Sequence, residues 1–361
     1  MTQLKRLQKI MAERNIEGIV LSSTLNQRYI TNFNYDDGYV VVLQNKAFLL
    51  TDFRYVEAAN AQVNHDDFEV VTPKVSHLKY ILSLAEQNGV KNMLVEESAL
   101  SLEDLSRFEA VAEGKVKYVN GASSILTEMR MVKTDAELEN MAEAQRITDL
   151  AFSHIIKVLH PEMTEIDVAL EIEFFMRKNG AERTSFDTIA VSGTASSMPH
   201  GVPRNVKLER GFLTMDFGCV YNGYCSDMTR TVVLGKADDE IKKVYNTVLE
   251  AQVKALEAAA NGERGCYRLD EIARDIINGA GYEGRFGHSL GHGVGMFIHE
   301  NPRLAPGMDR GAKLVTGNVV TFEPGIYIPE TYGCRIEDMA VITDGGIRNF
   351  TKSTKELIEL F

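Results

Sequence analysis

The chain between Phe212 and Leu234 reads FLTMDFGCVYNGYCSDMTRTVVL. Its two apolar runs are rich in β-branched and aromatic residues, and they flank Asn222-Gly223. Asn-Gly is the strongest short-range signal for a two-residue β-hairpin turn, because both positions of such a turn need a positive φ. With the turn at this dipeptide, Asp216 faces Thr229 across the hairpin. The stretch therefore predicts an antiparallel strand pair that holds polar residues at fixed places.

The same register brings two aspartates together. Asp227 faces Gly218, so Asp216 and Asp227 become diagonal neighbours on one face of the hairpin. A turn centred one residue earlier would place them directly opposite each other. Two carboxylates on an apolar strand pair repel each other unless a positive group lies between them, and a metal ion is the simplest such group. The alternative is a pair of solvated aspartates on an exposed face, and this stretch alone leaves both interpretations open.

The composition is ordinary for a globular protein, with 44% hydrophobic and 25% charged residues among 361. This length predicts about two domains. The net charge of −12 and the pI near 5.3 argue against binding to nucleic acid or to an anionic membrane surface. No apolar run is long enough to span a bilayer, and the first residues lack the apolar core of a signal peptide. The four cysteines show no Cys-x-x-Cys spacing and are typical of reduced thiols, so we expect a cytoplasmic protein.

Residues 1–122 are predicted to form a small α/β domain, because helical stripes alternate there with short apolar runs. This part holds no cluster of ligand-type side chains, since His65 and His77 are isolated. We therefore expect it to cover the site, to recognise substrate or to dimerise rather than to catalyse. Its expected helices lie near 4–11, 54–61, 77–87 and 102–108, and its strands near 18–21, 39–43, 47–50, 68–71, 92–95 and 115–119.

A stretch of small residues near 120–124 predicts a boundary, with a second domain over residues 123–361. Thr134 and Glu137 have the spacing of a capping box, which predicts the start of a long helix. Two helices followed by strands are then succeeded by two more helices and more strands. This order indicates two similar halves that face each other. The expected helices cover 135–159, 165–178, 239–261 and 269–277, and the strands outside the hairpin cover 188–192, 318–322 and 335–343.

Three further candidate ligands lie in the second half of the chain. His292 is surrounded by four glycines, which let the backbone turn tightly and leave room for a substrate beside the ring. Glu323 ends an apolar strand and Glu337 lies inside another, and a carboxylate in a buried strand needs a partner. Arg335 could supply that partner for Glu337, which is the alternative to metal binding there.

Four carboxylates and one imidazole form an oxygen-rich ligand set. They carry too much negative charge for one divalent ion and suit two, with Mn²⁺ or Co²⁺ favoured over Zn²⁺. Two ions a short distance apart hold a hydroxide between them and polarise a carbonyl group. The set therefore predicts a hydrolase with two metal ions, and its ligands are Asp216, Asp227, His292, Glu323 and Glu337.

The motifs of this half occur in a fixed order from residue 130 to residue 338. They are Arg130 with Lys133 and Glu137, residues 185–189, Pro199-His200-Gly201, the Asp216 hairpin, Gly291–Gly295 with His299-Glu300, Glu323-Pro324-Gly325 and Arg335–Asp338. In these motifs the chain resembles the pita-bread metallopeptidases, specifically the branch of aminopeptidase P and prolidase, which act at Xaa-Pro bonds. The resemblance implies an α+β fold, in which a creatinase-type N-terminal domain precedes a pita-bread catalytic domain. One departure is Ala195-Ser196-Ser197, where the family often has Asn before two small residues, and it affects a peripheral contact.

The resemblance also implies how the five ligands divide between two metal ions. Asp227 and Glu337 would bridge both ions. Asp216 would bind one of them, and His292 and Glu323 would complete the site of the other. Glu323 would also act as the general base for a metal-bridged hydroxide that attacks the scissile carbonyl.

Five other residues receive roles from the same resemblance. His200 and His299 would hold the scissile carbonyl and the developing gem-diolate. His288 would help to shape the pocket for the proline ring. Arg335 would orient the bridging glutamate from outside the ligand set. Arg303 is placed like a residue that meets the carboxylate of the substrate in prolidases.

The favoured interpretation is an Xaa-Pro aminopeptidase whose substrate is a peptide with proline at the second position, working as a homodimer. One alternative is a prolidase that cleaves Xaa-Pro dipeptides, because Arg303 could pair with a free C-terminal carboxylate. That arginine could equally form an ion pair with Glu300. A broader aminopeptidase and a peptide-binding module without catalysis are the remaining alternatives, and the intact ligand set argues against the last.

Overall fold

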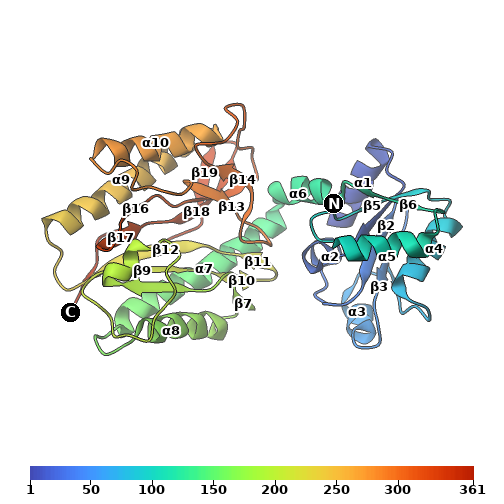
Figure 1. Cartoon of the computed structure of the whole chain (residues 1–361), viewed down its shortest axis with the longest axis horizontal. Coiled ribbons are helices and arrows are strands. Elements are labelled where there is room, and N and C mark those ends of the chain that lie inside the picture. Colours follow the sequence, from blue (N-terminus) through green and yellow to red (C-terminus); the bar gives the residue numbers. More distant parts are fainter. The chain divides into compact units, whose positions relative to one another are not determined.

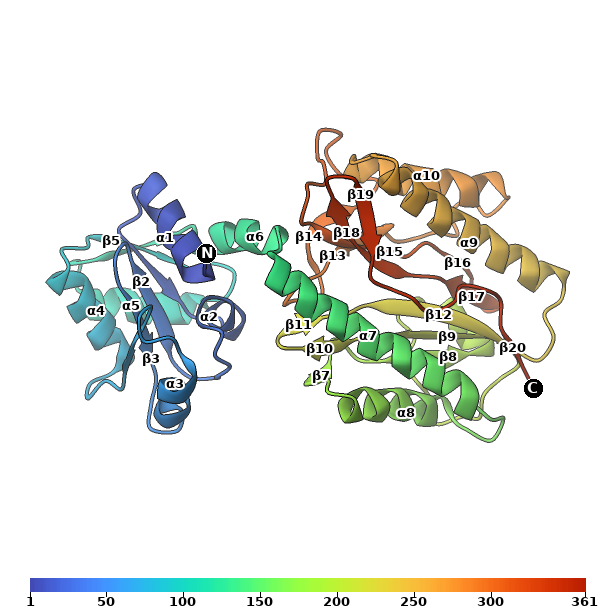
Figure 2. The same ribbon diagram turned by 180° about the vertical axis from the view of Figure 1, so that it is seen from behind.

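Two units make up the chain, Met1–Met129 and Arg130–Phe361. The computed structural model describes all residues from 1 to 361. Both units combine helices with β-sheets (Figures 1 and 2). Each unit has its own sheets and its own hydrophobic core, so each is described by itself.

The first unit is a mixed six-stranded sheet with helices packed against it. The strand order is β4-β3-β2-β1-β5-β6, with β1, β5 and β6 parallel and β1, β2 and β3 antiparallel. Ile81 and Phe108 of two helices join Val41 and Met93 of the sheet in one core. The predicted small α/β domain is confirmed. Its elements are α1 Gln3–Glu13, β1 Gly18–Leu21, α2 Thr24–Thr31, β2 Tyr39–Leu43, β3 Ala47–Leu50, α3 Val56–Gln62, β4 Glu69–Val71, α4 His77–Gln87, β5 Asn92–Val95, α5 Leu102–Ala112 and β6 Lys117–Asn120.

Helix α2 is the one element of this unit that the sequence pattern does not predict. Its buried face carries the polar residues Asn26 and Gln27, which interrupt the apolar periodicity. The helix is held instead by polar contacts at its start. Glu96 is fully buried and accepts hydrogen bonds from the Ser23 amide and from the side chain of Asn26.

The second unit contains two helix pairs, each packed on its own sheet, in the order that the sequence predicts. In Figure 1, α7 and α8 lie on one side of this unit and α9 and α10 on the other, with the strands between them. One core joins α7 and α8 to the sheet β20-β12-β9-β8, and another joins α9 and α10 to strands β15 to β18.

The elements of the second unit alternate as follows. Helix α6 Ala122–Met131 spans the division between the two units. The first half comprises α7 Asp135–Val158, α8 Glu165–Lys178, β7 Arg183–Thr184, β8 Ile189–Ser192, the 3₁₀ helix η1 Gly193–Ser197, β9 Gly211–Phe217, β10 Cys219–Tyr221, β11 Tyr224–Cys225 and β12 Met228–Leu234. The second half comprises α9 Asp239–Ala260, α10 Cys266–Gly279, β13 Gly291–Gly293, β14 Glu300–Leu304, β15 Val319–Phe322, β16 Gly325–Ile328, β17 Tyr332–Arg335, β18 Asp338–Thr343, β19 Gly346–Asn349 and β20 Glu359–Leu360.

The hairpin has the register predicted from its turn. Tyr221 pairs with Tyr224 around Asn222-Gly223, and the two turn residues have φ values of 46° and 84°. Farther from the turn, Asp216 pairs with Thr229 in the β9–β12 ladder. Local turn chemistry therefore fixes the places of the hairpin side chains.

The predicted strand over residues 335–343 is in fact two strands. β17 ends at Arg335 and pairs with β16, whereas β18 begins at Asp338 and pairs with β15. Between them the Glu337 amide donates to the carbonyl oxygen of Thr229 in β12, at 3.1 Å. The chain changes its partner strand here, which the alternation of apolar residues does not indicate. Glu337 therefore lies where the two halves of the unit meet.

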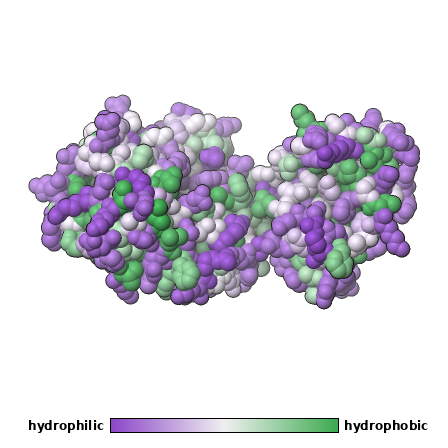
Figure 3. Space-filling view, turned by 60° about the horizontal axis from the view of Figure 1, so that its bottom comes forward, coloured by the Kyte–Doolittle hydropathy of each residue, from purple (hydrophilic) through white to green (hydrophobic).

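The surface is mainly hydrophilic on the face drawn in Figure 3, where hydrophobic residues form small, separate patches. Among the exposed apolar side chains are Leu170 and Phe174 of α8. None of the helices combines the length and the hydropathy that crossing a bilayer requires.

Gly218 gives a test of the hairpin. A Cβ atom at this position would lie 2.0 Å from the carbonyl oxygen of Ser226, so Gly218→Ala forces the two strands apart. Overpacking of this kind costs about 1–3 kcal/mol, so we expect the thermal midpoint to fall by roughly 4–8 °C for a cost of about 2 kcal/mol. Gly307→Ala is the control, because nothing lies within 4 Å of a Cβ there. Equal midpoints of the two variants in scanning calorimetry would contradict the close approach of the strands.

Candidate metal centre

One cavity in the second unit collects the candidate residues. It has a volume of about 560 Å³. Its lining comes from the hairpin and residues 186–189 and 199–203 of the first half, and from the strands and loops of the second half. All ten side chains to which the sequence assigns a role line it, and these are His200, Asp216, Asp227, His288, His292, His299, Arg303, Glu323, Arg335 and Glu337.

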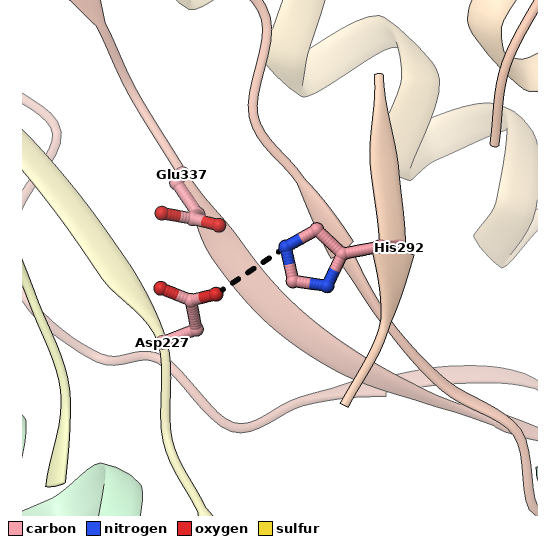
Figure 4. A group of neighbouring side chains, drawn as sticks. All are labelled: Asp227, His292 and Glu337. Atoms are coloured by element: carbon pink, nitrogen blue, oxygen red, sulfur yellow. Dashed lines mark ion pairs between the residues drawn. The ribbon is translucent and has the colours of Figure 1, made fainter. Parts of the chain in front are cut away.

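Asp227, His292 and Glu337 form a buried cluster within this cavity. One potential ligand atom from each of them lies within 4.8 Å of the other two. Figure 4 shows the two carboxylates side by side, with the imidazole facing them. They come from three separate places, since Asp227 precedes β12, His292 lies in β13 and Glu337 lies between β17 and β18. The cluster therefore depends on the packing of both halves.

The imidazole of His292 presents a lone pair to two carboxylates. Its Nδ1 lies 3.0 Å from the carbonyl oxygen of Gly293, which only accepts hydrogen bonds, so Nδ1 carries the proton. Nε2 is then an acceptor, yet it lies 3.5 Å from Asp227 Oδ2 and 3.3 Å from Glu323 Oε1. Burial lowers the pKa of His292 to about 4, so the ring is neutral at pH 7. Acceptors facing one another at these distances repel unless a cation lies between them, and a metal ion fits that place.

The four candidate carboxylates also lie in surroundings that favour a nearby positive charge. Burial raises the pKa of Asp227 and of Glu337 well above the usual range, and repulsion from neighbouring carboxylates adds to it. Burial also raises the pKa of Glu323 to about 8. Asp216 Oδ1 is buried without a hydrogen-bond partner, which is rare for a carboxylate oxygen. The five residues therefore fit divalent cations, which would keep all four carboxylates ionised.

Arg335 contacts Asp216 directly and Glu337 only indirectly. Its Nη2 lies 2.6 Å from Asp216 Oδ2, whereas its Nε donates to Thr229 Oγ1 at 3.0 Å. That hydroxyl in turn donates to Glu337 Oε2 at 2.7 Å. The guanidinium therefore reaches Glu337 only through Thr229. The direct ion pair with Glu337, which the sequence left open as the alternative to metal binding, is not formed.

The three cavity histidines outside the ligand set differ in their surroundings. His288 is held by the hydroxyl of Tyr327, 2.9 Å from its Nε2, and burial lowers its pKa to about 3. His299 is exposed, and its ring packs edge-on against His292 with 4.5 Å between centroids. Burial of part of the His299 ring lowers its pKa. His200 is exposed as well, so two accessible imidazole rings line the cavity.

Arg303 does not form the ion pair with Glu300 that the sequence left open. Both oxygens of Glu300 are occupied, by Arg130 Nε at 3.0 Å and by Lys133 Nζ at 3.2 Å. Arg303 is exposed at the cavity wall, directly across from His292 in the β13–β14 pairing. Its guanidinium is thus accessible to an anionic group in the cavity.

Sequence reasoning missed three hydroxyl groups that hold the candidate residues. Tyr327 bonds to His288 and accepts from Arg335 Nη1 at 2.7 Å, and Thr321 donates to Glu323 Oε1 at 3.0 Å. Thr229 is the third. Their only signal is a hydroxyl in an apolar strand, which is too common to indicate a site. The sequence analysis also did not predict that apolar side chains from separate segments line the cavity together. They include Phe186, Ile189, Val202 and Ile298.

Comparison with known families identifies this arrangement. Residues 139–344 match metallopeptidase family M24. The chain belongs to this family. Residues 3–132 of the M24 peptidase match the creatinase/prolidase N-terminal domain. The predicted combination of a creatinase-type domain with a pita-bread catalytic domain is confirmed, as is the prediction of a peptidase.

Relatives of the M24 peptidase match it along nearly the whole chain. The solved structure of an Xaa-Pro dipeptidase from Bacillus anthracis has a TM-score of 0.92 and 40% identity, covering 99% of each chain. That of an X-Pro aminopeptidase from Thermotoga maritima has a TM-score of 0.89 and 33% identity, covering 97% of this chain and 99% of its own. An Xaa-Pro dipeptidase from Pyrococcus furiosus is 35% identical over 358 residues, which is 99% of each chain.

The metal centre is tested by Glu337→Gln, which keeps the shape of the side chain and removes its charge. At a free Mn²⁺ concentration below the native Kd, we expect bound metal per chain to fall by at least about tenfold, because a lost charge-assisted contact is worth about 1.5–3 kcal/mol. Glu263→Gln is the control, since this carboxylate accepts from the amides of Arg264 and Gly265 at the start of α10. Elemental analysis after dialysis against Mn²⁺ measures both. Native metal content in Glu337→Gln would rule out this residue as a ligand.

Proposed function

We propose that this M24 peptidase hydrolyses the peptide bond before a proline at the second position and releases the N-terminal residue. The observation that carries the proposal is the buried set of carboxylates around His292, which faces a cavity lined by accessible imidazoles. Proline specificity is supported by relatives named Xaa-Pro dipeptidase and X-Pro aminopeptidase, which match along nearly the whole chain.

Five residues of the chain would hold two divalent ions. By the family resemblance, Asp227 and Glu337 would contact both ions, Asp216 would contact one, and His292 with Glu323 would contact the other. One imidazole among four carboxylates favours Mn²⁺ or Co²⁺ over Zn²⁺. When bound, two such ions supply a hydroxide at neutral pH and polarise the scissile carbonyl.

Side chains of the cavity carry out the proton transfer and stabilise the charge that develops on the substrate. Glu323 serves as the general base, because its carboxylate is fixed by Thr321 and faces the same space as His292. His200 and His299 donate N–H groups to the carbonyl oxygen as negative charge develops on it. Arg335 holds Asp216 in place through its 2.6 Å contact.

The proline ring requires an apolar pocket, because the bond before proline has no N–H to recognise. Ile298 and Phe186 supply apolar wall in the cavity, and His288 is fixed beside it by Tyr327. These side chains suit a rigid five-membered ring better than they suit a charged residue.

A second candidate is a dipeptidase, and the position of Arg303 favours it. Because Glu300 is occupied by Arg130 and Lys133, the Arg303 guanidinium remains accessible to a free C-terminal carboxylate. In a dipeptide that carboxylate belongs to the proline itself. In a longer peptide it lies farther along the chain, so Arg303 would contribute little.

Turnover of Ala-Pro and of Ala-Pro-Ala separates the two candidates. We expect the native protein to cleave Ala-Pro-Ala at least as fast as Ala-Pro, and Arg303→Ala to lower kcat/KM for Ala-Pro alone. The loss should be about 10–100-fold, the worth of a charge-assisted hydrogen bond. Arg310→Ala, which removes an exposed arginine that does not line the cavity, is the control.

Two results would change the proposal. A strong preference for Ala-Pro in the native protein, lost only in Arg303→Ala, would make this enzyme a dipeptidase. Cleavage of Leu-Gly-Gly without cleavage of either proline peptide would contradict the proline specificity itself. Absence of metal-dependent hydrolysis of all three would leave only a peptide-binding role.

A further inference from the structure

Glu300 is a buried carboxylate to which the proposed reaction gives no role. It is 7% exposed, and its two oxygens meet two cations, Arg130 and Lys133, of which Lys133 is 6% exposed. Burial lowers the pKa of Lys133, and the facing carboxylate works against this effect. All three residues belong to motifs that the sequence shows beside the catalytic ones. We call Arg130, Lys133 and Glu300 the Glu300 clamp.

The Glu300 carboxylate of the clamp packs against the segment that carries His299. Glu300 Oε1 accepts a hydrogen bond from the Phe297 amide at 3.2 Å. A Cβ atom at Gly295 would lie 2.4 Å from Glu300 Oε2, so the backbone at this glycine runs directly against the carboxylate. The Gly295 amide also donates to the carbonyl oxygen of Phe297 at 3.1 Å. Residues 295–299 are therefore folded around one carboxylate.

The same segment is attached to the hairpin. The Cys225 amide donates to the carbonyl oxygen of Gly295 at 2.8 Å, two residues before Asp227. The neighbouring Tyr224 hydroxyl donates to Glu137 Oε1 at 3.1 Å. Glu137 also closes the capping box of α7 by accepting from the Thr134 amide at 2.8 Å. The start of α7 thus holds both the hairpin tip and the His299 segment.

We propose that the Glu300 clamp positions His299 for hydrolysis. Glu300 is not among the residues that line the cavity, so it is a positioning residue that acts through the backbone of residues 295–299. The inference rests on the proposed function in one respect, namely that His299 donates a hydrogen bond to the carbonyl oxygen during hydrolysis. A buried ion pair often adds little stability over apolar residues of the same volume, so its effect is expected on geometry more than on stability.

Gly295→Ala tests the clamp without removing any charge. The added methyl group displaces the Glu300 carboxylate or the segment, and with it the His299 ring. A misplacement of about 1 Å can cost about 100-fold in rate, so we expect kcat to fall at least about tenfold. KM should change less than about threefold, and bound metal should equal that of the native protein, because His299 acts on charge that develops during the reaction.

A second variant separates positioning from stability. Lys133→Met/Glu300→Leu removes the buried Lys133–Glu300 ion pair as a whole, whereas Glu300→Leu alone leaves the buried Lys133 without its counter-charge. Arg130, whose side chain is 12% exposed, is retained in both variants. We expect the double variant to recover most of the thermal stability lost in Glu300→Leu and to keep the low kcat. Recovery of kcat together with stability would show that the clamp only stabilises the fold and would overturn the proposal.

Imidazole NMR of the protein loaded with diamagnetic Zn²⁺ provides a readout without catalysis. The chain has 8 histidines, so the His299 signal can be assigned by its absence in His299→Gln. We expect this signal to shift or broaden in Gly295→Ala and in the double variant. Glu96→Gln is the matched control, a fully buried carboxylate of the first unit that also holds a loop amide, and it should leave the His299 signal and kcat unchanged.

Two outcomes would overturn the positioning role. One is an unchanged His299 signal with kcat, normalised to bound metal, within about twofold of the native value in both variants. The other is a loss of metal that accounts for the whole loss of activity, since Glu300 would then act through the metal centre. Because the NMR readout needs no substrate, a failure of the proline specificity leaves this test intact.

Discussion

Mutual repulsion of four carboxylates within one cavity is the constraint on which the second unit depends. Burial raises the pKa of Asp227, Glu323 and Glu337, and the lone pair of His292 points at two of these side chains. Arg335 offsets part of the negative charge at Asp216. Divalent cations would offset the remainder, and this need explains why so many acidic groups lie together inside a folded protein.

The two halves of the second unit contact each other at the candidate metal ligands, and these contacts hold the carboxylates in place. Thr229 of β12 binds Glu337 through its hydroxyl and its carbonyl oxygen. Beside it, the buried Arg230 donates to the carbonyl oxygen of Glu337 at 2.6 Å and pairs with Asp338 at 2.8 Å. A ligand contributed by the second half is thus fixed in both main chain and side chain by the first half. The geometry of the metal centre therefore depends on how the two halves pack against each other.

The sequence predicts those parts of the structure that follow from local chemistry. The Asn222-Gly223 turn sets the register of Asp216, and residue types along strands single out the other ligands. Partners that lie far apart in the chain are not predictable in this way. Glu300 pairs with Lys133, 167 positions away, and Arg335 with Asp216, 119 positions away, and only the folded chain brings such pairs together. The strand break before Asp338 was missed for the same reason, because its cause is a change of partner strand.

The decisive measurement is a crystal structure with Mn²⁺, in which anomalous scattering locates the ions. Two peaks about 3.5–4 Å apart in the cavity, both in contact with Asp227 and Glu337, are the predicted result. One peak should also contact Asp216, and the other His292 and Glu323. A single peak at full occupancy, or peaks that avoid Glu337, would contradict the explanation of the acidic cavity as a centre for two metal ions.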